Sequence, residues 1–498
     1  MYRLLLFCLL AMAVTSGFCK SNEKQIVEKT PWGKEVFTIP QFKNNDYVIT
    51  DFGAKPEAEY NNQKHIQSAI DQCNKAGGGK VIVPAGTWLT GFLDMKSNVN
   101  LHLKAGATLL FSNKIEDYMV PTFTRWEGFE CMNYHPLIYA RNCQNIAISG
   151  KGKINGNGSA WWFMKKKQHM TLPTLYQQIL DGVTPEKRNL LAYEHQSMLR
   201  PALIQFVGCK NILLKDFEVT SGPMWTVHMV YGENVIAQNI RVVTKGANND
   251  GIIPDSCNKV LIDNCYFSTG DDCIVIKSGL NEDGWRVGKP SQHIVIKNCN
   301  TNHGHGGVVI GSEMSGGVNH VYAHDCNFSN TDRGLRIKSR IGRGGVIENL
   351  WFENITMNNI KNEAIKLNMH YGASSITPKS DKKPVFRNFY FKNIYSENSK
   401  HALHAKGISD QLIANMSFEN MQLSSKYGMT IINAEKFNFK NISLKTKEEV
   451  SVKVEQSKDI NFRKIKAEGA GKEGKVVLKG DNQKVKFKPQ LKNISHEN

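Results

Sequence analysis

The chain lacks several features that would point to common classes of protein. It has no pair of cysteines in a C-x-x-C arrangement, and beyond its first residues no apolar run approaches the roughly 20 residues of a membrane helix. No nucleic-acid-binding motif is present. These absences disfavour a zinc site and predict that the folded part does not cross a membrane. We expect a monomer with neither a bound metal nor another cofactor.

Only the first residues of the chain contain a sustained apolar run. Arg3 is followed by an apolar run, Leu4–Val14, and then by small residues at 15–17. This order is typical of a secretory signal peptide, which we place at residues 1–19. We therefore expect export to the periplasm or the exterior. Attachment of a lipid at Cys19 is the weaker alternative, because the bulky Phe18 precedes it.

The cysteine content favours free thiols over a disulfide framework. Two of the eleven cysteines lie in the leader, and the remaining nine are an odd number for a chain with an exported leader. Several fall in strand-like runs, where a small thiol packs as a hydrophobic group. The cysteines in such runs are Cys265, Cys273, Cys299 and Cys326.

The formal net charge of +18 favours a polyanionic partner. Nucleic acid and acidic polysaccharide both satisfy this condition, and the leader favours the polysaccharide. Part of the excess charge has a simpler explanation. Lysines are frequent between Lys436 and Lys492, where keeping an exposed end soluble would be a sufficient role for them.

From about residue 140 the chain repeats a short alternating strand that closes with Asn or Asp and an apolar residue. Successive closing residues are 21 to 39 positions apart. Such a unit must stack on its neighbours to bury its apolar face, which predicts an all-β, right-handed parallel β-helix. Asn at one point of each coil suits a left-handed turn and a ladder of side-chain amides. The closing residues are Asp216, Asn239, Asn264, Asn298, Asp325, Asn354, Asn393, Asn420 and Asn441.

Other repeat folds fit less well. A leucine-rich horseshoe needs its own leucine spacing and a helix in each unit, and a β-propeller needs repeats longer than most of these. We predict an N-terminal capping helix from the helical spacing of Ile66, Ala69, Ile70 and Cys73, which ends before Gly77.

The expected organisation is an N-terminal extension at 20–45 and a single β-helix domain at 46–495. The segment Ser159–Arg200 is longer than a tight turn. It is either an insertion that walls one side of a cleft or a surface excursion packed by its own aromatic residues.

The repeat register brings chemically active residues together. Asp271 follows Asn264 by seven residues, and His305 follows Asn298 by the same seven. Since coils stack about 4.8 Å apart, we expect the two side chains to lie within hydrogen-bonding reach.

Two other aspartates require irregular backbone to join this column. Asp272 would face away from Asp271 in a regular strand, so joint action requires a bend, which Gly270 can supply. Asp250 lies one repeat earlier and follows its closing Asn239 by eleven residues, which predicts a longer turn before it.

Two cations complete the column. Arg336 and Lys338 are two residues apart in a strand and therefore point to the same side. Three carboxylates, an imidazole and two cations form a cluster that can cleave a glycosidic bond.

These motifs carry a resemblance to a known family. Asn248–Gly251, Gly270–Asp272, Gly304–Gly306 and Arg336–Lys338, in this order, resemble glycoside hydrolase family 28, the polygalacturonases. The resemblance extends over nearly the whole chain, from Asp51–Ala54 and Gly78–Pro84 to the last repeats. Two positions depart from the family pattern: Asn249 stands where Thr is usual, and Thr301 stands where a larger apolar residue is common.

The resemblance implies inverting hydrolysis of α-1,4-galacturonosidic bonds in pectin or polygalacturonate. It makes Asp271 the general acid, with Asp250 and Asp272 activating water and His305 tuning the acid. Crowding of carboxylates should keep one of them protonated at mildly acidic pH. Arg336 and Lys338 would bind the substrate carboxylate. Further candidates for substrate contact are Asn248, Lys277, Arg286, Arg343 and Tyr371.

Two alternatives remain open from the residues alone. A pectate-lyase-like enzyme would use the aspartates to bind calcium, although the Gly-His-Gly motif has no role in that chemistry. A catalytically silent polysaccharide-binding β-helix is the other. Within the hydrolase reading, Glu282–Gly288, Ile310–Gly317 and the insertion after Ser159 favour exo action over endo action.

Overall fold

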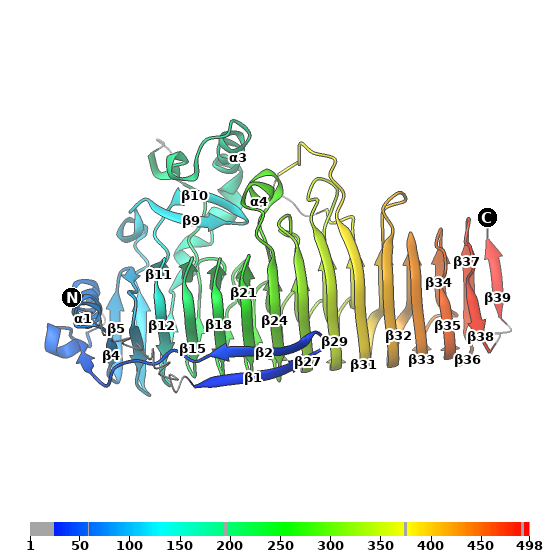
Figure 1. Cartoon of the computed structure of the whole chain (residues 1–498), viewed down its shortest axis with the longest axis horizontal. Coiled ribbons are helices and arrows are strands. Elements are labelled where there is room, and N and C mark those ends of the chain that lie inside the picture. The colour runs from blue at the N-terminus through cyan, green and yellow to red at the C-terminus, as the bar shows by residue number, and fades with distance from the viewer. Residues whose placement is uncertain (1–23, 58, 193–196, 373–375, 490–492, 498) are drawn as a thin grey trace, which may run out of the picture.

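The computed structural model describes residues 24–57, 59–192, 197–372, 376–489 and 493–497. These residues wind into stacked coils of parallel strands (Figure 1). Strands of successive coils pair in register, as β14 (Ile204–Val207) does with β17 (Val227–Val230). The predicted right-handed parallel β-helix is confirmed. The signal peptide predicted at 1–19 lies outside the described residues.

The strands form three parallel sheets. The first, called here the site sheet, contains β6 (Leu93–Asp94), β11 (Ile138–Arg141), β14, β17, β20 (Ile252–Asp255), β23 (Ile274–Ile276), β26 (Val308–Ile310), β28 (Leu335–Lys338) and β30 (Glu363–Asn368). The second contains β3 (Asp46–Val48), β4 (Gly79–Val83), β7 (Val99–Leu103), β12 (Gln144–Ser149), β15 (Lys210–Lys215), β18 (Glu233–Gln238), β21 (Asn258–Asp263) and β24 (Ser291–Lys297). The third contains β5 (Gly86–Thr90), β8 (Ala107–Phe111), β13 (Lys153–Asn155), β16 (Glu218–Thr220), β19 (Arg241–Val243), β22 (Tyr266–Ser268) and β25 (Asn300–Thr301).

Longer strands turn the corners between sheets in the C-terminal half. β27 (Val318–Ser329), for example, pairs with β24 and also with β25. The other strands of this half are β29 (Val346–Asn358), β31 (Val385–Lys406), β32 (Ile413–Ile432), β33 (Ala434–Thr446), β34 (Val450–Glu455), β35 (Asn461–Gly469), β36 (Lys472–Glu473), β37 (Lys475–Lys479), β38 (Lys486–Lys488) and β39 (Ile494–Glu497).

The closing residues of the repeats form the predicted turn ladder. All nine adopt positive φ angles, from 51° at Asn264 to 69° at Asp216. The Nδ2 of Asn264 donates to the Oδ1 of Asn239 at 2.8 Å, and equivalent bonds continue along most coils. The ladder changes partner once, where Asn298 donates to Asp263 at 2.9 Å. These side chains tie most coils to the coil before them.

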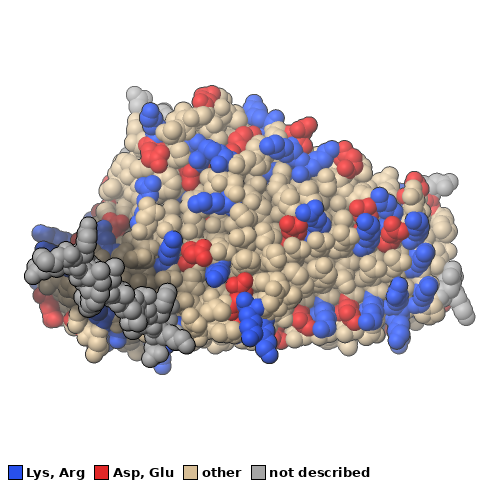
Figure 2. Space-filling view, viewed as in Figure 1, with Lys and Arg blue, Asp and Glu red and all other residues tan. Residues whose placement is uncertain are grey.

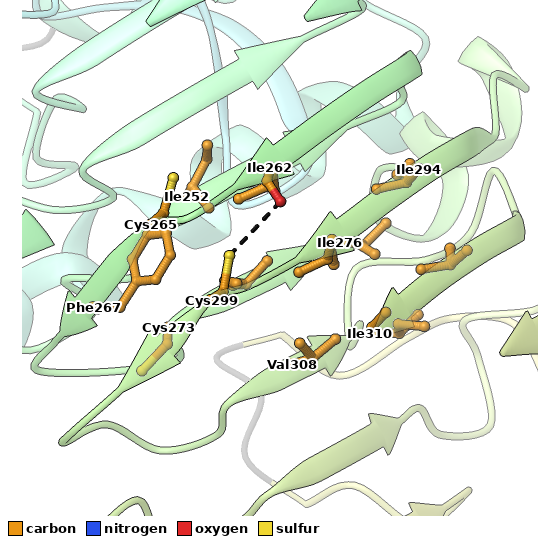
Figure 3. Close-up of a cluster of buried hydrophobic side chains, with 14 of the residues drawn as sticks. Ile252, Ile262, Cys265, Phe267, Cys273, Ile276, Ile294, Cys299, Val308 and Ile310 are labelled. Atoms are coloured by element: carbon orange, nitrogen blue, oxygen red, sulfur yellow. Dashed lines mark hydrogen bonds between the residues drawn. The ribbon is translucent and has the colours of Figure 1, made fainter. Parts of the chain in front are cut away.

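The interior of the coils is apolar. Ile252 and Val308 are in register through Ile274 between them, Ile276 stacks on Ile310, and Cys265 and Phe267 belong to the same buried cluster (Figure 3). All nine cysteines that the structure describes are free, and eight of them are buried. The Cys299 thiol donates to the carbonyl of Ile262 at 3.7 Å. The prediction of core thiols is therefore confirmed.

The ends of the solenoid are covered differently. Helix α1 (Gln63–Lys75) caps the N-terminal end, and its four predicted apolar residues are all fully buried. At the other end, Figure 2 shows Lys and Arg side chains gathered over the last coils. The hairpin of β1 (Gln25–Thr30) and β2 (Gly33–Thr38) runs across several coils (Figure 1). No helix within the described ranges is long and apolar enough to cross a membrane.

A second layer stands above the site sheet (Figure 1). It consists of a hairpin, β9 (Thr122–Trp126) and β10 (Phe129–Asn133), and of helices α2 (Met164–Lys167), α3 (Leu172–Leu180) and α4 (Asn281–Val287). The hairpin, α3 and the residue before α4 share an apolar cluster that includes Trp126, Phe129, Leu175, Leu199 and Leu280, whereas Met164 of α2 packs in the main core. Short 3-10 turns span Ile49–Phe52, Ile115–Tyr118, Gly158–Trp161, Gln168–Met170, Pro185–Lys187 and Leu190–Ala192.

Candidate active site

Three aspartates meet above the site sheet. Asp250, Asp271 and Asp272 each bring one carboxylate oxygen within 4.8 Å of the others. Ile252 pairs with Ile274, so Asp250 and Asp272, each two residues earlier, occupy equivalent positions on neighbouring coils. We call these three residues the aspartate trio.

A bend allows adjacent aspartates to share the site. Asp271 and Asp272 lie between strands, and the Asp272 N–H donates to Asp271 Oδ1 at 2.9 Å. A Cβ atom on Gly270 would lie 2.1 Å from the carbonyl oxygen of Gly246. Glycine is therefore required where this turn approaches the turn that precedes Asp250. The bend predicted at Gly270 is confirmed.

The turn before Asp250 is longer than its neighbour, as predicted. It spans 244–251, eight residues, whereas the turn before β23 spans 269–273, five residues. Asn249 explains how the longer turn is held. Its Oδ1 accepts from the N–H of Gly246, and its Nδ2 donates to the carbonyls of Gly222 and Met224, at 3.0 to 3.1 Å. Asn249, which stands where the family usually has Thr, thus holds the backbone of this turn in place.

His305 lies on the next coil, beside Asp271. Its Nδ1 is 3.0 Å from Asp271 Oδ1, and its backbone N–H donates to the Asp271 carbonyl at 2.9 Å. The hydrogen bond to Asp271 raises the pKa of His305. His303 is not part of this contact, because its ring bonds to the carbonyl of Thr269. The repeat register predicted this pairing correctly.

Arg336 and Lys338 approach the trio from the following coil. Lys338 Nζ donates to Asp272 Oδ2 at 2.7 Å, and Arg336 Nη1 donates to Asp272 Oδ1 at 3.4 Å. Both cations also lie over the ring of Tyr371, at 5.1 and 5.5 Å from its centroid. The sequence placed these cations on one face, and the structure brings them together with Tyr371.

Lys277 is held by an acidic residue that the sequence reasoning missed. Its Nζ forms an ion pair with Glu313 and lies 3.8 Å from Asp250 Oδ2. Burial raises the pKa of Glu313, but Lys277, Arg343 and Lys338 together outweigh burial and lower it to about 2. The available signal was a Glu in the turn that follows strand β26, three residues after the strand ends.

Asp250 and Asp271 do not titrate as equal groups. Burial and the charge of Asp271 raise the pKa of Asp250 well above its usual range. Burial also raises the pKa of Asp271, but the hydrogen bond and charge of His305, with the charges of Lys338 and Lys277, outweigh burial and lower it to about 2. Crowding therefore keeps one carboxyl protonated, as expected, and in the free site that carboxyl is Asp250.

Other sequence candidates have mixed outcomes. Asn248 lines the cavity, and its Oδ1 accepts from Arg200 Nη2 at 2.8 Å. Arg343 also lines the cavity and donates to Asn281 Oδ1 at 2.7 Å. Arg286 is absent from the residues that line the described cavity. It pairs instead with Asp283 and Glu130, so its proposed substrate contact is not supported.

The trio lies in a cavity of about 820 Å³. Glu127 and Phe129 of the β9–β10 hairpin and Lys165 and Leu172 of the insertion form its walls. The insertion therefore walls a cleft, the first of its two predicted roles. The lining residues that sequence reasoning missed include Glu127, Lys165, Trp225, Lys245, Glu313, Asp332 and Arg333.

The charges around the trio favour proton chemistry over calcium binding. Three carboxylates within 4.8 Å have the spacing of a cation site. However, Lys338 and Arg336 bond to Asp272, His305 bonds to Asp271, and Lys277 lies near Asp250. Calcium prefers six to eight oxygen ligands, and here basic side chains already bond to both oxygens of Asp272 and to one oxygen of Asp271. The arrangement disfavours the lyase alternative.

Comparison with known proteins gives consistent results. Residues 187–434, which include all the residues of the trio, match Glycosyl hydrolases family 28. A probable polygalacturonase from Vitis vinifera is 29% identical over 426 residues, covering 83% of this chain and 80% of the relative. An exo-poly-alpha-D-galacturonosidase from Dickeya chrysanthemi is 29% identical over 438 residues, with coverages of 79% and 70%. The crystal structure of a hyperthermoactive exopolygalacturonase from Thermotoga maritima is 35% identical, with coverages of 80% and 89% and a TM-score of 0.73.

Proposed function

Because the chain belongs to glycosyl hydrolases family 28, we propose that it hydrolyses α-1,4-galacturonosidic bonds in pectin or polygalacturonate from the chain end. The observation that carries this proposal is the combination of the aspartate trio with Arg336 and Lys338 in one cavity. Carboxylates supply the acid and base that glycosidic hydrolysis needs. The two cations match a substrate that bears a carboxylate on each sugar.

We assign Asp271 as the general acid. Its side chain is 19% exposed, whereas those of Asp250 and Asp272 are 4% and 1% exposed, so Asp271 reaches furthest into the cavity. The leaving oxygen takes a proton from Asp271, water attacks the anomeric carbon, and the proton of the water passes to Asp250 or Asp272. The trio therefore holds the same number of protons before and after the reaction.

The resting position of the proton adds a step to this assignment. The pKa of Asp250 is raised and that of Asp271 is low, so the proton must move from Asp250 to Asp271 before cleavage. Oxygen atoms within 4.8 Å allow this transfer directly or through one water molecule. A substrate carboxylate bound nearby would favour it, because negative charge raises the pKa of Asp271.

The stereochemical outcome is proposed from the family. The nearest oxygens of the trio lie closer together than the roughly 6.5–9.5 Å separation of ordinary inverting pairs. Inversion therefore requires the attacking water to sit beside the acid and not between two distant carboxylates. The anomeric configuration of the first product decides this point.

Exo action is supported by the walls of the cavity. The β9–β10 hairpin and the insertion stand over the N-terminal side of the site sheet (Figure 1). The relatives from Dickeya chrysanthemi and Thermotoga maritima are both named as exo-acting enzymes. We also propose export of the chain, on the apolar leader at 1–19. N-terminal sequencing of the mature protein would test export.

The experiment is incubation with polygalacturonate and with galacturonate oligomers of defined length. We expect new reducing ends, one small product released from the start, and an inverted anomeric configuration by NMR. A ladder of intermediate products would contradict exo action, and ultraviolet absorbance from an unsaturated product would contradict hydrolysis. Asp271→Asn is the matched inactive control, because it keeps the size of the side chain.

A further inference from the structure

The tip of the β9–β10 hairpin has an unusual residue for its backbone. Trp126 pairs with Phe129, so Glu127 and Gly128 form a two-residue turn with φ angles of 41° and 88°. Turns with positive φ at both positions favour Asn followed by Gly. A Glu at the first position is strained, because its Cβ meets its own backbone.

The tip cannot relax by moving. Arg125 forms a fully buried ion pair with Asp255 at 2.9 Å. The carbonyl of Gly128 accepts from the Leu280 N–H at 3.2 Å, and a Cβ on Gly128 would lie 2.8 Å from that same nitrogen. The hairpin therefore holds Glu127 at a fixed point on the cavity wall.

The carboxylate of Glu127 has no structural partner. It lines the cavity, and no hydrogen bond or ion pair of its side chain is found among the described residues. Burial raises its pKa, and Lys165 offsets this only in part. An unpaired, partly buried carboxylate destabilises a fold, as does a strained backbone. Glu127 combines an unpaired carboxylate with a strained backbone, and it faces the reaction cavity. This combination indicates that its carboxylate makes its contact when substrate binds.

We propose that Glu127 binds the C3 and C4 hydroxyl groups of the terminal sugar and so sets the requirement for a free chain end. This inference rests on the proposed function. Neighbouring hydroxyls can donate to the two oxygens of one carboxylate. In an α-1,4-linked chain, C4 carries a free hydroxyl only at the non-reducing end. A longer chain would also bring the next carboxylate against Glu127, where like charges repel.

The test uses two trimers of galacturonate. One has an ordinary terminal sugar, and the other has a 4,5-unsaturated terminal sugar, which lacks the C4 hydroxyl. We expect the wild-type protein to prefer the ordinary trimer. In Glu127→Ala, kcat/KM should fall about 10- to 100-fold on the ordinary trimer and little on the unsaturated one. An equal fall on both trimers, or no fall, would overturn the inference.

A second variant separates binding from folding. Asn tolerates positive φ, so Glu127→Asn should melt at a higher temperature than the wild type while losing the preference between trimers. A residue with a purely structural role would not show stability and preference changing in opposite directions. Glu186→Gln, at a side chain that is 61% exposed, is the control and should keep both properties.

The two proposals fail in different ways. Wild-type protein that releases no sugar from either trimer would overturn the proposed function together with this inference. Wild-type protein that hydrolyses the trimers, paired with a Glu127→Asn variant that retains the wild-type preference, would overturn this inference alone.

Discussion

His305 Nδ1 lies 3.0 Å from Asp271 Oδ1, although the two residues are 34 positions apart in the chain. The two residues lie on adjacent coils of the β-helix, so they meet only because the coils stack in register. The contact acts on both partners. It raises the pKa of His305 and, against the effect of burial, lowers the pKa of Asp271 to about 2.

The first prediction concerns the acidic limb of the pH profile. We expect activity to require one proton on the trio, and a second proton, on Asp271, to abolish it. Removing the imidazole in His305→Gln removes the charge that opposes this second proton. The pKa of Asp271 then rises toward about 3.9, and the acidic limb of kcat/KM should move up by about 1 to 2 pH units.

His303→Gln provides the matched comparison for this profile. His303 is two residues away, and its ring bonds to the carbonyl of Thr269 without contacting the trio. The acidic limb of the kcat/KM profile of His303→Gln should therefore stay at the wild-type position. An unchanged acidic limb in His305→Gln would show that His305 does not control the protonation of Asp271.

The second prediction concerns the stability contribution of Asp250. Its pKa is raised in the folded protein, so folding favours its protonated form. Its contribution to stability is therefore complete below the unfolded pKa of about 3.9 and is lost as pH rises toward the folded value. Asp250→Asn removes this loss. Its melting temperature should exceed that of the wild type at about pH 7, and the gain should shrink at about pH 4.

Activity should respond to this change in the opposite direction. Asp250→Asn removes both a resting proton site and a water-activating base, and kcat should fall by about 10³-fold or more. Lys277 keeps Glu313 as its partner, so no buried cation is left alone. A variant less stable than wild type at neutral pH would contradict the assignment of the raised pKa to Asp250.

The third prediction concerns Glu313, which we regard as a positioning residue. Glu313→Gln removes the partner of Lys277, whose nearest remaining carboxylate is Asp250, 3.8 Å away. A stronger pairing would lower the pKa of Asp250. The trio would then lose its proton at lower pH, and the basic limb of kcat/KM should move down.

Ser312→Ala serves as the control for Glu313. The Ser312 hydroxyl donates to Glu313 at 2.8 Å, so its loss weakens the placement of the carboxylate and leaves its charge in place. We expect a small fall in kcat and no shift of the limb. If Glu313→Gln lowers the maximal kcat/KM without moving the basic limb of the pH profile, Glu313 only supports packing.

The repeat carries most of what the sequence could predict. The spacing of Asn264 to Asp271 matches that of Asn298 to His305, and this local count placed two side chains in contact. The longer turn before Asp250 was predictable for the same reason. In a solenoid, each coil contacts only its neighbours, so sequence distance from a register mark translates directly into position.

Features outside the repeat could not be read in this way. Glu127 reaches the cavity from a hairpin whose place depends on the packing of Arg125 and Leu280. The partner of Asn248 is Arg200, which lies outside the repeat register. The upward shift of the Asp250 pKa depends on how deeply the side chain is buried, and the identity of a residue does not reveal its burial.

The fourth prediction tests the Asn ladder that holds the coils together. Asn393 has a φ of 54°, donates to Asn354 at 2.9 Å, and accepts from Asn420 at 3.1 Å. Asn393→Ala should lose both bonds and strain the turn, at a cost of about 2 to 4 kcal/mol in the free energy of unfolding. Asn393→Gly loses the same bonds but accepts the positive φ, so its cost should be lower by about 1 to 2 kcal/mol. Urea unfolding measures both, and equal costs for Ala and Gly would show that the ladder bonds, and not the left-handed turn, explain why Asn recurs in the coils.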